Sequence, residues 1–405
     1  MKKSLFALAA MSAFAGAVQA QSSVTVYGIV DESVVSSQTK ATNGVKATND
    51  SIASGVASTS RLGFRGVEDL GGGLTASFTA EAGMNAATSG SGGLLSTSAT
   101  SGNRQTFVRL DQKGMGGVYG GYHVTDTHSA RATNDPFGGI NLPGNPIVGV
   151  TLGNIAASST ISTNLYPVIG TASATVAGGT STNQDYILRA PMIGFTTAPI
   201  AGVTLTYQRA QANAVSITSA NVETPTRSNG NTFGARYTLG KLNVLAAYND
   251  TVNQTLITGT NNNRKVQNTT VGANYDFGVA RIYATYSNDQ MKFDDATLAN
   301  NNDVKNTNTQ VAVQAPIGAV TLRAGYTTGK YTLGRSQAAS GGLGGARDTS
   351  GYQAGVFYGL SKRTDIYAAY GSQSRKVIST LVDSTDTAYA AVYVIHSNDV
   401  IASIC

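Results

Sequence analysis

Cysteine, histidine, tryptophan and proline are scarce in this sequence of 405 residues, with counts of 1, 3, 0 and 8. The single cysteine, Cys405, excludes an intrachain disulfide. Histidines without partnering cysteines or clustered carboxylates do not form a metal site, and nothing indicates a cofactor. The serines lack a nucleophile elbow and the glycine clusters lack a P-loop frame. The sequence therefore predicts a protein that is not an enzyme.

Charge and long apolar runs are scarce as well. Charged residues make up 12% of the chain, which is low for a soluble protein. Hydrophobic residues make up 41%, which is too few for a helical membrane protein. No stretch beyond the N-terminal region reaches the roughly 18 apolar residues of a membrane helix. The net charge of +6 is spread along the chain. It favours anions weakly and does not indicate nucleic acid.

The first twenty residues have the features of a secretory signal peptide. Lys2 and Lys3 precede an apolar segment, residues 5–18, and a small-residue site that ends at Ala20. No linker or change of composition divides the rest of the chain. We therefore expect a signal peptide over residues 1–20 and a single domain over residues 21–395, followed by a tail over 396–405. Export without a helical anchor leaves the periplasm, secretion or the outer membrane as locations.

Residues 58–81 predict the plan of the whole chain, because they form two extended segments joined by a tight, acidic, glycine-rich turn. After the turn, one face is apolar, with Leu74, Ala76, Phe78 and Ala80. The other face is polar, with Thr75, Ser77, Thr79 and Glu81, and before the turn Arg61 and Arg65 also lie on the polar face. Two arginines and a glutamate on an enclosed face favour a water-filled lumen over a soluble sandwich. This pattern is typical of a transmembrane β-barrel.

Short and long connections alternate along the rest of the chain. The predicted short turns are residues 67–73, 112–117, 198–202, 239–241, 277–278, 315–318 and 360–363. The predicted long loops are roughly 36–59, 85–103, 125–184, 211–230, 250–264, 289–305, 329–348 and 373–386. Seven turns and eight loops require sixteen strands, and bacterial barrels have an even strand number with short turns at one end.

Three blocks resemble the general porins of Gram-negative bacteria, of the β-proteobacterial type. They are residues 60–81, which resemble the second and third strands of that family, residues 23–31, which resemble the first strand, and residues 360–364, which resemble the last short turn. The resemblance spans residues 22 to about 389. It implies a 16-stranded antiparallel transmembrane β-barrel in the outer membrane, as a homotrimer among outer-membrane lipids, with passive diffusion of small hydrophilic solutes and ions. It also implies that the third long loop folds into the pore, with Asp135 near its tip.

The same resemblance implies pore-lining arginines at the constriction. Arg61 of the Ser-Arg-Leu-Gly motif is one, Arg104 at the start of the fourth strand is another, and Arg189 after the long loop is a third. Arg104 shares its alternation with apolar residues, whereas Arg109 shares the polar face. Either Arg109 faces the lumen, or a bulge turns Arg104 inward.

Rings of fixed charge at the narrowest point set selectivity in such a pore. Arginines opposite acidic groups of the third loop, such as Asp135, predict a weak anion preference. Gly120-Gly121-Tyr122 replaces a Leu-Gly-Arg that is usual in the fifth strand of the family, which removes one wall charge.

The C-terminal residues depart from the resemblance. We expect a sixteenth strand up to residue 395, paired with residues 24–30. In porins of this type the barrel-assembly machinery recognises a terminal aromatic residue, and residues 396–405 lack one. The tail therefore predicts slow assembly.

A secreted or surface-anchored β-rich adhesin is the alternative interpretation. Abundant Ser, Thr, Asn and Gly would suit a β-solenoid. A solenoid should show a fixed repeat period, whereas the predicted loops here differ in length.

Overall fold

The computed structural model describes residues 23–40, 46–84, 103–138, 144–145, 189–217, 223–257, 260–294, 304–333, 345–377 and 384–391. Within them one helix, α2 (Asp126–Thr133), accompanies a single sheet. The strands are β1 (Ser23–Ile29), β2 (Glu32–Lys40), β3 (Lys46–Ser54), β4 (Arg61–Gly71), β5 (Leu74–Gly83), β6 (Asn103–Gln112), β7 (Gly116–Val124), β8 (Arg189–Thr197), β9 (Val203–Ile217), β10 (Glu223–Leu239), β11 (Leu242–Ile257), β12 (Thr260–Asp276), β13 (Arg281–Asp294), β14 (Val304–Ile317), β15 (Val320–Leu333), β16 (Gly345–Gly359), β17 (Asp365–Val377) and β18 (Ser384–Ala391).

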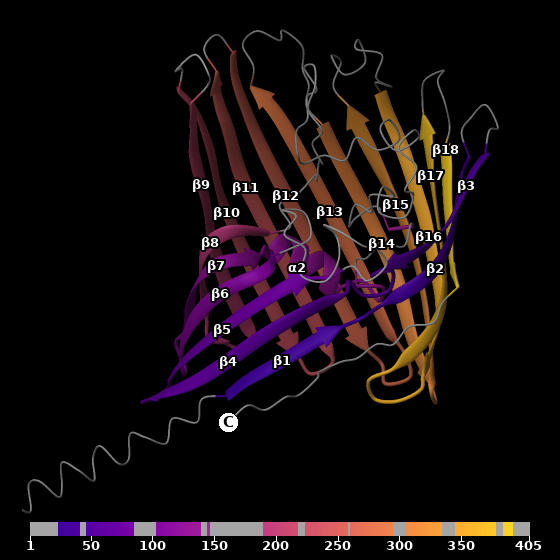
Figure 1. The fold of residues 1–405 in the computed structure, drawn as a ribbon, viewed down its shortest axis with the longest axis horizontal. Coiled ribbons are helices and arrows are strands. Elements are labelled where there is room, and N and C mark those ends of the chain that lie inside the picture. The colour runs from indigo at the N-terminus through magenta and orange to yellow at the C-terminus, as the bar shows by residue number, and fades with distance from the viewer. Residues whose placement is uncertain are drawn as a thin grey trace, which may run out of the picture.

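The sheet closes into a barrel (Figure 1). β1 and β2 are two halves of the first wall strand, and β3 and β4 are two halves of the second. β1 pairs with β4, β2 pairs with β3, and every later strand pairs antiparallel with the next. β18 then pairs with β2. Counted by wall position, the described residues form the predicted sixteen-stranded antiparallel barrel.

The last strand pairs with the first, as expected, but at a different place. β18 lies against residues 34–40 of β2 and not against residues 24–30, so that part of the expectation was wrong. The antiparallel register decides this, because Ala391 is opposite Val34 and Ser37 is opposite Ala388. Residues 392–395, the predicted tail and the predicted signal peptide lie outside the described residues.

The seven predicted short turns all join neighbouring strands at one end of the barrel. The turn between β4 and β5 needs three glycines, because Gly71, Gly72 and Gly73 have φ of 83°, 62° and 80°. At the other end the strands are longer than the sequence predicted. β15 and β16, for example, reach Leu333 and Gly345, inside the predicted loop 329–348. Ladder hydrogen bonds continue through these polar residues, which an apolar pattern does not reveal.

Burial is inverted relative to a soluble protein. On the inner face Asn268 and Thr270 are 0% exposed and Asn308 is 1% exposed, whereas outward-facing Val271 and Val311 are 42% and 56% exposed. Apolar residues outside and hydrogen-bonded polar residues inside are the arrangement of a barrel that stands in lipid.

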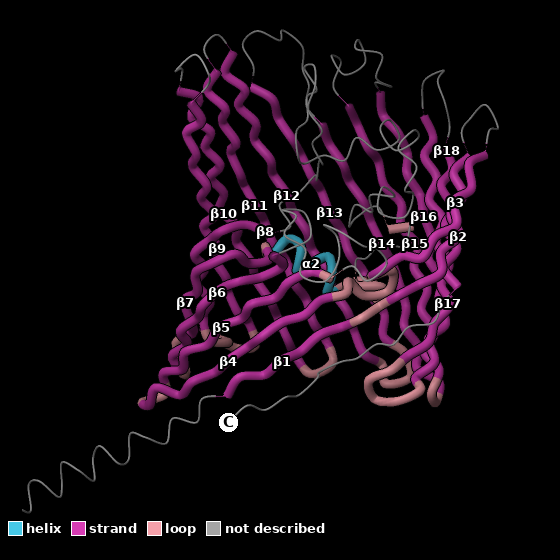
Figure 2. Tube along the Cα trace, viewed as in Figure 1, coloured by secondary structure: helices cyan, strands magenta, loops and turns pink. Residues whose placement is uncertain are grey.

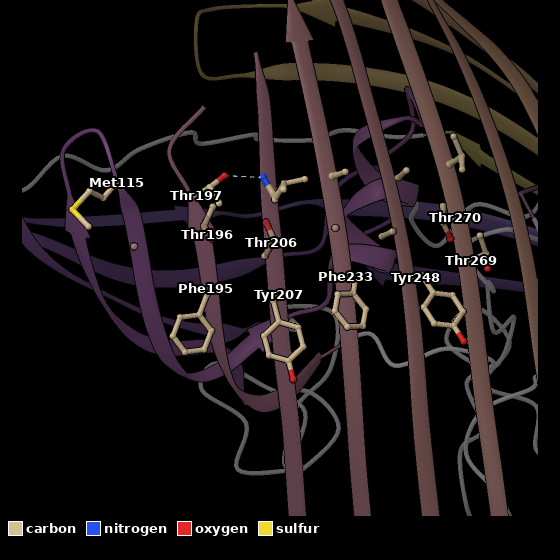
Figure 3. A pocket seen from close by; sticks show the side chains of 17 residues that line it. Met115, Phe195, Thr196, Thr197, Thr206, Tyr207, Phe233, Tyr248, Thr269 and Thr270 are labelled. Atoms are coloured by element: carbon tan, nitrogen blue, oxygen red, sulfur yellow. Dashed lines mark hydrogen bonds between the residues drawn. The ribbon is translucent and has the colours of Figure 1, made fainter. Parts of the chain in front are cut away.

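An aromatic row crosses the outer face over β8 to β11. Phe195, Tyr207, Phe233 and Tyr248 are direct cross-strand partners, and Figure 3 shows their rings side by side. The ring centroids of Phe195 and Tyr207 are 6.4 Å apart, and those of Tyr207 and Phe233 are 5.2 Å apart. Such a row matches the aromatic girdle at a membrane interface.

α2 lies inside the barrel, surrounded by strands (Figures 1 and 2). Thr125 caps its N-terminus by accepting from the backbone N–H of His128 at 3.4 Å. Asp126 in the first turn and Arg131 in the last complement the helix dipole. Since α2 belongs to the connection between β7 and β8, the predicted folding of the third long loop into the barrel is confirmed. No helix among the described residues is long and apolar enough to cross a membrane.

Candidate functional site

Four side chains from neighbouring strands meet on the inner wall at Glu81, and we call them the Glu81 cluster: Tyr27, Arg61, Glu81 and Arg104. The Arg104 Nε donates to Glu81 Oε1 at 2.6 Å, and the Tyr27 hydroxyl donates to Glu81 Oε2 at 3.1 Å. The Arg61 Nε is 3.9 Å from Glu81 Oε2. Glu81 is buried, and the Arg61 side chain is more exposed than that of Arg104, at 25% against 14%. One carboxylate thus pairs tightly with one arginine and loosely with the other.

Gly63 of the Ser-Arg-Leu-Gly motif makes this geometry possible. Tyr27, Gly63 and Glu81 form one cross-strand row over β1, β4 and β5. A Cβ atom at Gly63 would lie 2.4 Å from Tyr27 Cζ. Only the missing side chain lets the tyrosine ring lie across β4 and reach Glu81.

For the fourth wall strand, the sequence left open whether Arg109 faces the lumen or a bulge turns Arg104 inward, and the structure contains both features. The pairing of β5 and β6 shifts register between Glu81 and Ala82, and this bulge leaves Arg104 without a cross-strand partner and turned toward Glu81. Arg109 lies opposite Ser77, on the polar face of β5. It forms a bidentate pair with Asp111, with both N–O distances at 2.6 Å, and its Cζ lies 5.6 Å from the centroid of the Tyr119 ring.

The remaining predicted site residues are more scattered. Arg65 is exposed, with its Cζ 5.3 Å from the centroid of the Tyr27 ring. Arg189 is the first residue of β8, opposite Val124. Asp135 is buried and accepts hydrogen bonds from Asn145, from the Phe137 backbone and from Gln310 of β14. Its carboxylate therefore fixes the third loop to the wall at β14.

A second row of inner residues, which we call the amide row, fastens α2 to the wall. Thr232, Asn249, Asn268 and Asp289 are direct partners on β10 to β13, and each donates to the next at 2.9 to 3.1 Å. Asp289 accepts from Arg131 of α2 in an ion pair whose side chains are both 1% exposed. Sequence reasoning missed this pair, although Arg131 lies within the predicted loop.

The pKa values of two side chains of α2, Asp126 and His128, are shifted by the surroundings of the helix. Burial raises the pKa of Asp126, against the opposing charge of Arg236 on β10. Burial also lowers the pKa of His128 well below 6.5, and the charges of Arg189, Arg131 and Arg104 lower it further. The helix therefore lies between the arginines of the short strands and the wall formed by the long strands.

A second inward segment, residues 55–60, was also missed. Val56 is buried with Phe137 of the third loop and with Phe357 and Tyr367 of the wall. Asp31, 0% exposed, holds the segment by accepting from the backbone N–H of Ala57 at 2.7 Å and from the Tyr367 hydroxyl at 2.9 Å. The interruption of the first two wall strands at this point, predicted as part of loop 36–59, is thus a packed lumen structure.

These features define a membrane-embedded β-barrel whose lumen is narrowed by inward segments and lined by paired and loosely paired charges. The described residues contain no group of three or more His, Cys, Asp or Glu side chains that could hold a metal ion. Such an arrangement suits the passage of solutes.

The sequence matches the Gram-negative porin family over residues 7–377, and the chain belongs to that family. It is 26% identical to an outer membrane porin protein of Bordetella pertussis, over 96% of this chain and 98% of that protein. Its structure is similar to that of the anion-selective porin from Comamonas acidovorans, with a TM-score of 0.59 and 23% identity, over 92% of this chain and all of that one. The trimer form of OmpT from Vibrio cholerae has a TM-score of 0.53 at 14% identity, over 91% of this chain and 99% of that one. The chain is therefore an outer-membrane channel protein and not an enzyme, and the adhesin alternative was wrong.

Proposed function

We propose that the channel passes small hydrophilic solutes and ions with a preference for anions, and that Arg61 contributes to this preference. The observation that supports it is the imbalance of the Glu81 cluster, in which two arginines share one carboxylate. Arg104 takes the short contact. Arg61 is left at 3.9 Å and is the more exposed of the two, so its charge is the one that a passing ion meets.

The size of the effect follows from simple electrostatics. Two unit charges 4 Å apart interact by about 1 kcal/mol even in bulk water, and more strongly in a narrow, less polar pore. Charges beyond about 8 to 10 Å are screened at physiological salt. A lumen arginine therefore acts on ions that an arginine or lysine on the outer surface does not reach.

The names of similar proteins agree with this proposal. The Comamonas acidovorans porin is described as anion-selective, and one form of the Vibrio cholerae protein is a trimer. We infer the same preference and a homotrimer for this chain, with residues 1–20 as the export signal and the barrel-assembly machinery as the route into the membrane.

Reversal potentials in a salt gradient across planar bilayers test the proposal. We expect stepwise conductance without an energy source, and a reversal potential that Arg61→Ala moves toward cations. Lys330→Ala is the matched control, because it also removes one positive charge, from an exposed position on β15 that the sequence had placed in an external loop. A folded barrel that never conducts would refute the channel, and equal reversal potentials for wild type and Arg61→Ala would refute the role of Arg61.

A further inference from the structure

Arg323 of β15 lacks the carboxylate partner that several other arginines around the lumen have. Arg61, Arg104, Arg109 and Arg281 of the wall and Arg131 of α2 each have a carboxylate within ion-pairing distance. Arg323 forms no ion pair and donates no hydrogen bond to any residue in the described part of the chain, and its Nε is buried without an acceptor there. Its charge is therefore not neutralised by direct contact with the protein.

The Arg323 side chain is nevertheless held in place. Its Cζ lies 3.8 Å from the centroid of the Phe357 ring, a cation–π contact. The ring of Phe357 is stacked on Tyr367, with centroids 5.1 Å apart. Gly355, the cross-strand partner of Arg323, leaves room for this arrangement, because a Cβ there would lie 2.9 Å from the Phe357 ring.

The order of contacts along β16 gives the height of Arg323 in the lumen. Gly351 lies against Gly144 of the third loop, Gly355 lies close to Phe137 of the same loop, and the Phe357 ring contacts Arg323. Each step leads toward the short turn at residues 360–364. Short turns face the periplasm in bacterial barrels, so Arg323 lies on the periplasmic side of Gly144.

We propose that Arg323 is an oxyanion-binding site in the periplasmic half of the lumen, where the carboxylate or phosphate group of a small solute binds in transit. A guanidinium presents a planar fork of N–H donors that matches such oxyanions, and stacking on Phe357 fixes the plane of that fork. Asp135 and Asp365 lie within electrostatic range but beyond ion-pairing distance. Asp135 is already occupied by three donors, so it does not compete for Arg323.

Arg281 provides a matched control. Gln314 of β14 is the cross-strand partner of both Arg281 and Arg323, so the two arginines belong to one cross-strand row, one on each side of Gln314. Arg281 is paired with Asp276 at 2.9 Å. Replacing either arginine by glutamine removes one positive charge from that row, but only Arg323→Gln removes a guanidinium without a carboxylate partner.

The experiment measures chloride current through single channels while inorganic phosphate, and in a second arm acetate, is added to the periplasmic side. This inference rests on the proposed channel function. We expect both oxyanions to reduce the chloride current of wild type, and the half-inhibiting concentration to rise about threefold or more in Arg323→Gln, the change expected from one charge-assisted contact in a wet site. Arg281→Gln should shift it little. Arg323→Lys, which keeps the charge but loses the planar fork, should retain the reversal potential and still weaken inhibition.

Equal shifts for Arg323→Gln and Arg281→Gln would overturn the proposal, as would a wild-type current that neither oxyanion reduces. Heat-modified gel mobility confirms that each variant is folded before it is measured. Failure of the proposed anion preference is seen separately, in the reversal potential without oxyanion. If the channel lacked an anion preference but Arg323→Gln still weakened its inhibition by oxyanions, the proposed anion preference would be refuted and the oxyanion site at Arg323 would be supported.

Discussion

The two rows that cross the inner wall place their charges in opposite ways. The row of Tyr27, Gly63 and Glu81 lies on short strands of 7 to 11 residues and leaves Arg61 loosely paired beside the lumen. The amide row lies on strands of 14 to 17 residues, and its single charge, Asp289, is buried against Arg131 of the third loop. In the proposed function the first row acts on ions, whereas the amide row holds α2 of the third loop inside the barrel. Neutral hydrogen-bonded side chains suit the second task, because they hold a loop without adding a field of their own.

The largest effect should come from breaking the amide row at its charged end. Asp289→Ala leaves the buried Arg131 without its carboxylate, which typically costs about 3 to 5 kcal/mol. We expect a lower unfolding temperature and a larger, noisier conductance, because α2 loses its ion pair with the wall. Thermal unfolding measures the change in unfolding temperature, and single-channel recording measures the change in conductance.

Asp276→Ala is the control for that change. It also removes the carboxylate of an ion pair with arginine, but the side chains of Arg281 and Asp276 are exposed, at 44% and 37%, and a solvent-screened pair of this kind contributes little to stability. If the two variants lost equal stability, the buried pair would not be the anchor of the third loop.

The next effect tests the other row. Gly63→Ala places a methyl group 2.4 Å from the Tyr27 ring, so the ring must move away from Glu81. Overpacking of this kind costs about 1 to 3 kcal/mol. We expect reduced stability and a changed reversal potential. Gly120→Ala on β7, where no atom lies within 4 Å of the added Cβ, should change neither. Tyr27→Phe separates loss of the hydroxyl from displacement of the ring.

The sequence was sufficient for the barrel but not for its interior. Turn glycines and strict alternation are local, so they predicted all seven turns and the polar faces that carry Arg61, Glu81 and Arg109. The sequence did not decide whether a bulge is present at Arg104. One extra residue in a strand turns a side chain to the other face of the sheet, but the alternation of polar and apolar residues does not reveal it. Strand length beyond the membrane was underestimated, since polar strands and polar loops have similar compositions.

Contacts between residues far apart in the chain could not be predicted, because they leave no periodic pattern in the sequence. Asp31 and Tyr367 are 336 positions apart, and Arg131 and Asp289 are 158 apart. Asp135 is a second example, in which a side chain makes contacts that the sequence did not predict. Its position in the third loop suggested a pore-facing acid, but three hydrogen bonds turn it to the wall. Which carboxylate faces the lumen depends on packing, and packing is not periodic.

A smaller effect sharpens the contrast in charge between the rows. Glu81→Gln removes the only carboxylate of the Glu81 cluster and leaves two positive charges. We expect the reversal potential to move further toward anions, opposite in sign to Arg61→Ala and on the order of 1 kcal/mol in ion free energy. A shift in the same direction for both variants would mean that the cluster acts through its shape and not through its charge.

The smallest effect concerns His128, which lies on α2 between the two walls. Its pKa is lowered by burial and by Arg189, Arg131 and Arg104, so the folded protein keeps this ring neutral where the unfolded chain binds a proton near pH 6.5. Lowering the pH through 6.5 therefore stabilises the unfolded chain, and the free energy of unfolding falls until the lower pKa of the folded state is reached. Between pH 7 and 6 the loss should be about 1 kcal/mol or less, because one proton contributes at most about 1.4 kcal/mol per pH unit. His128→Gln should remove this part of the pH dependence, so the difference between the two stability curves isolates it. Parallel curves would show that the His128 ring is not kept neutral by burial in the folded barrel, and would contradict the position of α2 between the two walls.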